Sequence, residues 1–146
     1  MQHWLTPAAV ALVCWGIWAF LPKITTRYID PASALVFEAG GGVIVALVVL
    51  ISIGFKLNFD WRGFALALTT GMLGVLGALS YLYAVTRGPV ALIATVTALY
   101  PALTIVLAFV VLQESINLRQ AIGILLGLVA LILITGGDQA PTGGTG

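Results

Sequence analysis

The stretch from residue 87 to residue 135 decides the fold, and it reads RGPVALIATVTALYPALTIVLAFVVLQESINLRQAIGILLGLVALILIT. It holds two long apolar segments, residues 89–112 and 118–135, separated by a short polar turn. At a rise of about 1.5 Å per residue, the first segment forms a helix of about 36 Å, enough to cross a hydrocarbon core of about 30 Å. The second segment is close to the minimum spanning length. We therefore expect two antiparallel membrane-spanning helices here, with Asn117 as the N-cap of the second.

The composition indicates that lipid surrounds most of the chain. Of 146 residues, 61% are hydrophobic and 8% are charged, whereas a soluble domain carries about 25% charged residues. The net charge of +1 gives no case for nucleic-acid binding. A lone Cys14 excludes an intrachain disulfide, and His3 is the only histidine, so we expect no metal centre and no cofactor. Without a Ser/His/Asp set or a phosphate loop, an enzyme is not expected.

Prolines mark the ends and bends of the other predicted spans. Thr6-Pro7 and Asp30-Pro31 each place a capping residue before a proline, which is typical of a helix start. The first helix should continue past Pro22 with a kink, and Pro101 should bend the fourth near mid-membrane. The predicted architecture is an all-α membrane domain over residues 1–137 with a disordered polar tail over 138–146, and its five spans cover residues 7–26, 31–54, 63–86, 89–112 and 118–135.

Four short motifs in the opening stretch closely resemble the second half of an EamA domain, the repeat unit of the drug/metabolite transporter superfamily. They are Gly88-Pro89-Val90-Ala91, Ala98-Leu99-Tyr100-Pro101, Leu112-Gln113-Glu114 and Gln120-Ala121-Ile122-Gly123. The chain resembles a single five-helix member of a family whose larger members fuse two such repeats. The resemblance implies that the first four helices surround a central cavity and that the fifth supports dimer contacts.

Glu38 is the one acidic residue well inside a predicted span. It lies roughly 10 Å past the helix start at Pro31. An intramembrane acid usually lines a pathway, pairs with a cation or relays protons. Glu38 is therefore a candidate coupling site, and the alternative is a hydrated or hydrogen-bonded structural acid. In longer family members an Arg often stands near this position, which leaves the sign of the substrate's charge open. Glu114, in the polar turn, is expected to be solvated or to cap the last helix.

Aromatic and small residues supply the remaining candidates. Trp15 and Trp18, one turn apart, either form an aromatic wall of a substrate cavity or serve in helix packing or anchoring at the membrane interface. Tyr81 ends a face of small residues on the third span, which predicts helix contact. The substrate-binding candidates are Glu38, Trp15, Trp18, Tyr81, Thr97 and Tyr100. The GxxxG pair Gly123 and Gly127 is either a dimer seam or an intrachain packing face.

The basic residues give no orientation signal. With a cytoplasmic N-terminus, three lie inside and three lie outside: Lys56, Arg62 and Arg119 against Lys23, Arg27 and Arg87. The positive-inside rule then favours neither orientation. Two oppositely inserted copies would form an antiparallel homodimer, as inverted repeats do in many transporters. The alternatives are a fixed orientation and a heteromeric partner.

We therefore predict a transporter of small organic metabolites or drugs in the prokaryotic cytoplasmic membrane, working by alternating access. Two other functions stay open, namely a non-transporting partner subunit and a flippase for a lipid-linked substrate. The small multidrug transporters of the superfamily carry an essential acid in their first helix. Aligning Lys23 with their basic residue at the end of that helix places Trp15 at the acidic position, so their exchange mechanism does not carry over.

Overall fold

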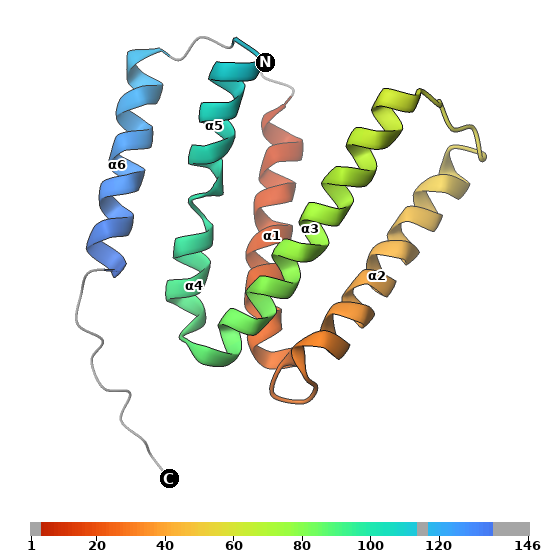
Figure 1. Ribbon diagram of the computed structural model, residues 1–146, viewed down its shortest axis with the longest axis horizontal. Coiled ribbons are helices and arrows are strands. Elements are labelled where there is room, and N and C mark those ends of the chain that lie inside the picture. Colours follow the sequence, from red (N-terminus) through yellow and green to blue (C-terminus); the bar gives the residue numbers. More distant parts are fainter. Residues whose placement is uncertain (1–3, 114–116, 136–146) are drawn as a thin grey trace. The chain divides into compact units, whose positions relative to one another are not determined.

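The computed structural model describes residues 4–113 and 117–135, and all its regular elements there are α-helices (Figure 1). The chain divides into two units, residues 1–90 and 91–146. The helices are α1 (Leu5–Thr25), α2 (Pro31–Ser52), α3 (Trp61–Arg87), α4 (Val90–Thr97), α5 (Tyr100–Val111) and α6 (Leu118–Thr135).

Within residues 4–113 and 117–135, four segments are long and apolar enough to cross a membrane. They are α1, α2, α3 and the combined stretch Val90–Val111, while α6 contains the shorter apolar helix Ala121–Ala130. This pattern fits the predicted five-helix membrane architecture. The prediction for Glu114 lies outside the described residues, as do His3 and the tail.

In the first unit, α3 packs against both α1 and α2, and the contacts gather near one end of the three helices (Figure 1). The buried residues of the described chain all lie there: Pro22 on α1, Ala34 on α2, and Ala78, Tyr81, Leu82 and Val85 on α3. The rest of the apolar surface of these helices is exposed, as expected for surfaces that meet lipid or another subunit.

The first helix begins earlier than predicted. Its N-cap is Trp4, which makes no side-chain capping bond, so Thr6 is not the cap. Pro7 is accommodated because N–H groups of the first turn have no intrahelical acceptor. The helix continues through Pro22 to Thr25, and the Thr26 hydroxyl donates to the Pro22 carbonyl at 2.8 Å.

The cap predicted at Asp30 is present at the start of α2. Its carboxylate accepts from the backbone N–H groups of Ala32 and Ser33, both at 3.0 Å, and from the Ser33 hydroxyl at 2.6 Å. These bonds, that of the Ser33 hydroxyl above all, lower the pKa of Asp30 below its ordinary value of 3.8.

The far end of α2 closes with glycine in the left-handed region. Gly54 has φ +62° and Phe55 has φ +60°. The Phe55 N–H donates to the Leu50 carbonyl and the Gly54 N–H to the Ile51 carbonyl. This is the Schellman pattern, in which a glycine just past the helix satisfies its last carbonyls. The predicted span to residue 54 therefore includes the cap.

Both ends of α3 differ from the predicted span of residues 63–86. Asp60 is the N-cap, and its carboxylate accepts from the Gly63 N–H at 2.9 Å, so the helix starts at Trp61. At the other end Arg87 is helical, and the turn to α4 consists of Gly88 and Pro89. The Asp60 carboxylate thus provides an acceptor for the Gly63 N–H, which has no carbonyl partner in the first turn of the helix.

The fourth predicted span is broken into two helices, which corrects the expectation of one bent helix. Pro101 has no N–H to donate to the Thr97 carbonyl four residues earlier, and its ring crowds that carbonyl. Accordingly, α4 ends at Thr97 and α5 begins at Tyr100. The break thus lies on the N-terminal side of the proline.

Candidate functional site

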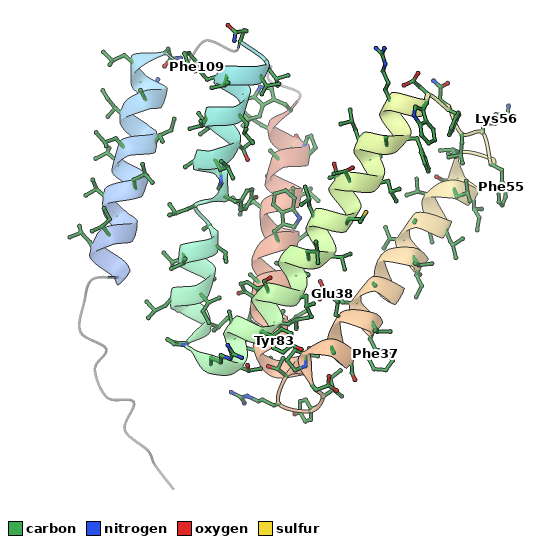
Figure 2. All side chains as sticks on the ribbon, viewed as in Figure 1. Phe37, Glu38, Phe55, Lys56, Tyr83 and Phe109 are labelled. Carbon is green, nitrogen blue, oxygen red and sulfur yellow. The ribbon has the colours of Figure 1, made fainter. Side chains whose placement is uncertain are left out.

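Glu38 and Trp18 join α2 to α1 through one short hydrogen bond. The indole N–H of Trp18 donates to Oε1 of Glu38 at 2.6 Å. Glu38 is half-buried and points toward α1, whereas its neighbour Phe37 points away (Figure 2). The contact holds the carboxylate at a defined position among three helices.

Tyr81 completes this group, which we call the Glu38 cluster (Glu38, Trp18 and Tyr81). The Tyr81 ring lies against the Trp18 ring with centroids 5.4 Å apart and planes tilted by 33°. Its hydroxyl donates to the Ala19 carbonyl at 2.6 Å. Tyr81 is buried, with 5% of its surface exposed, and Trp18 retains 37%. One end of the Trp18 ring is therefore fixed by α3, and the indole N–H is directed to α2.

Lys23, expected only as a basic residue at the end of the first helix, also joins α1 to α3. Its ammonium donates to the carbonyls of Val85 at 2.6 Å and Gly88 at 2.9 Å, at the C-terminal end of α3. The Val85 carbonyl would normally accept from residue 89, but Pro89 has no N–H. A basic residue is also favoured beside the negative end of a helix dipole. The proline four residues after Val85 was the signal available in the sequence.

The Glu38 carboxylate has no positive partner among the described residues. Trp18 donates its one hydrogen bond there, and no lysine or arginine of the described chain forms an ion pair with it. Lys23 lies on α1, five residues after Trp18, but its ammonium is bound to carbonyls at the end of α3. A carboxylate inside a span without a counterion is costly unless water or a ligand supplies the missing interaction.

The other site candidates are not part of this cluster in the described contacts. Trp15 is 59% exposed. In the second unit, Thr97 donates to the carbonyls of Ile93 and Ala94 of its own helix, and Tyr100 is 57% exposed at the start of α5. A role for Trp15, Thr97 and Tyr100 in substrate binding therefore stays a prediction.

The glycines inside the helices, among them the predicted pair Gly123 and Gly127, have no close neighbour from another helix among the described residues. A Cβ added at any residue of the Gly40-Gly41-Gly42 run would find nothing within 4 Å, and the same holds for Gly71, Gly74, Gly123 and Gly127. On the small-residue face of α3, only Ala78 and Tyr81 are buried. The expected contact of its two glycines with another helix is therefore absent within the described chain.

Comparison with known proteins places this architecture in a family. The family model described as "EamA-like transporter family" matches residues 3–136. The chain is also similar to an uncharacterized protein of Methanocaldococcus jannaschii, at 27% identity over 123 residues, which is 84% of this chain and 89% of that protein. No solved structure matches the chain. The match spans nearly the whole sequence, and the chain is a multi-pass membrane protein that belongs to the EamA-like transporter family of the drug/metabolite transporter superfamily.

Proposed function

We propose that this protein is a secondary transporter of small organic metabolites or drugs, with Glu38 as its substrate- and proton-binding residue. The observation that carries the proposal is the position of Glu38 between α1, α2 and α3, bound by Trp18 and without a counterion among the described residues. Intramembrane carboxylates with this character commonly serve ion and substrate pathways. Family membership supports transport as the activity, since its members are transporters rather than enzymes.

Proton coupling follows from competition at one carboxylate. When Glu38 binds a proton, it loses the negative charge that attracts a cation or the amine of a zwitterion. A substrate and a proton then occupy the residue in turn, which couples their movements in opposite directions. The Trp18 N–H donates to Oε1 and so holds the carboxylate in place.

The proposed working unit is an antiparallel homodimer in the prokaryotic cytoplasmic membrane. Two features support it: the equal division of basic residues between the two sides, and the exposed apolar surfaces of α2 and α3 outside the buried end. Gly123 and Gly127, open on α6, are the proposed seam. Alternating access would then move two inverted copies about one central cavity.

A screen of transport currents tests the activity. Proteoliposomes with a pH gradient receive amino acids, polyamines or quaternary ammonium compounds, and wild type is compared with Glu38→Gln. A current with one class that disappears in the variant supports a coupled transporter. Because exchange of one proton for one monovalent cation moves no net charge, uptake of each compound is measured beside the current. Absence of both current and uptake with all classes would contradict the proposal and favour a partner subunit or a lipid-linked substrate.

Orientation is tested by labelling a single cysteine. Cys14→Ala with Asn58→Cys places the thiol in the exposed turn between α2 and α3. An impermeant maleimide added to intact spheroplasts should label about half of the molecules if both orientations exist. Complete labelling or none would show one orientation and contradict the homodimer, while leaving a heteromeric transporter open.

A further inference from the structure

A ligand at the Glu38 cluster would find hydrogen-bond acceptors and an aromatic surface. It would find no free hydrogen-bond donor on the three side chains of the cluster. The one N–H of the Trp18 indole is used by Glu38 Oε1. The one O–H of Tyr81 is used by the Ala19 carbonyl. On α2, the residues one turn before and after Glu38 are Ala34 and Gly42, which have no polar side chain. The unused hydrogen-bonding capacity of the cluster belongs to the carboxylate, whose Oε2 has no described donor.

The charges around the cluster, like its lack of free donors, favour a cationic ligand. Two of the three Lys23 N–H groups are used by the Val85 and Gly88 carbonyls, so its ammonium already has partners on α3. An anion at the Glu38 cluster would meet a carboxylate and the exposed part of the Trp18 ring, and both repel it. A cation would instead supply the counterion that Glu38 lacks among the described residues. It would also contact the Trp18 ring, and tryptophan is the best aromatic partner for a cation.

We propose that the Glu38 cluster selects an organic cation without a carboxylate group. This inference rests on the proposed transport function and adds the substrate class, which the sequence leaves open. A zwitterion carries an anionic group that needs donors, and the described donors of the cluster are already bound to protein. A primary or alkylated ammonium attached to an apolar body satisfies Oε2 and covers the exposed part of Trp18.

Three compounds that share a phenylethyl group separate the charge classes. They are 2-phenylethylamine as the cation, phenylalanine as the zwitterion and 3-phenylpropanoate as the anion. Binding to the full chain in micelles is followed by tryptophan fluorescence, and transport by current in proteoliposomes. We expect the amine to bind at least tenfold more tightly than either other compound.

Variants assign the selectivity to Glu38. Glu38→Gln should weaken binding of the amine at least tenfold and remove the preference over 3-phenylpropanoate. Asp60→Asn is the matched control, because it removes the same charge while an asparagine can still cap α3. Trp18→Phe should lose most of the fluorescence change but keep the order of preference, since an aromatic face remains. A preference that disappears equally in Asp60→Asn would overturn the assignment to Glu38.

The two proposals fail in different ways. Equal or tighter binding of phenylalanine or 3-phenylpropanoate, or no binding of the amine at millimolar concentration, would overturn the cation class. A current carried by either of those compounds would at the same time support the transporter. Glu38-dependent binding of the amine without any uptake or current would support the cation site and contradict transport.

Discussion

Lys23 should stabilise the packed end of the first unit more than any other basic side chain of the described chain. Lys23→Met keeps the length of the side chain but removes two charged hydrogen bonds, at 2.6 Å to the Val85 carbonyl and 2.9 Å to the Gly88 carbonyl. Each bond to a charged group contributes about 1.5–3 kcal/mol. Fixing a lysine side chain opposes this by up to about 2 kcal/mol. We expect the free energy of unfolding to fall by about 2 kcal/mol.

The matched control is Arg27→Met. Arg27 follows α1 at the same end of the helices and is exposed, so its loss changes the balance of basic residues in the same way. Exposed substitutions of this kind usually change stability by about 0.5 kcal/mol or less. Unfolding free energies are measured by steric trapping in micelles. Equal effects of the two substitutions would refute the reasoning, because the Lys23 bonds would then contribute nothing beyond charge.

Three further predictions concern the helix ends. Gly54→Ala should destabilise the protein by about 1 kcal/mol, since φ is +62° there. Gly16→Ala within α1 should instead stabilise it by about 0.5–1 kcal/mol, so thermal unfolding that moves in the same direction for both would contradict the argument. Pro101→Ala restores an N–H for the Thr97 carbonyl and should slow deuterium exchange between α4 and α5, and unchanged exchange would show another cause for the break. Because folding lowers the pKa of Asp30, its stabilisation is complete above pH 3.8 and is lost as the pH falls through the lower folded value. Asp30→Asn should remove this part of the acid sensitivity, and an identical acid profile of the variant in thermal unfolding would contradict it.

Local signals in the sequence predicted much of the helical architecture. The capping of α2 follows from Asp30 next to Pro31, since both act within one turn. The disruption near Pro101 also follows from a local cause. The exact position of the break, at residues 98–99, could not be predicted from the sequence. A proline can either bend a helix or end it, and both outcomes leave the carbonyl four residues earlier without its usual donor.

The site depended on contacts between helices, which periodicity alone does not specify. Glu38 and Trp18 were each recognisable as candidates, one as an intramembrane acid and the other as an aromatic. Their hydrogen bond requires a particular rotation of α1 relative to α2, and that rotation follows from the packing of both against α3. The contacts of Lys23 could not be predicted for the same reason, since its acceptors lie 62 and 65 residues away in the chain.

The role of Glu38 in coupled transport is the central claim, and proton-driven uptake tests it most directly. Proteoliposomes containing wild type, Glu38→Gln or Asp60→Asn receive 2-phenylethylamine under an imposed pH gradient, and internal pH is followed together with uptake. The account predicts coupled movement of amine and protons in wild type and Asp60→Asn, and neither in Glu38→Gln. Undiminished coupled uptake by Glu38→Gln would contradict it and would leave Glu38 with a structural role between α1 and α2.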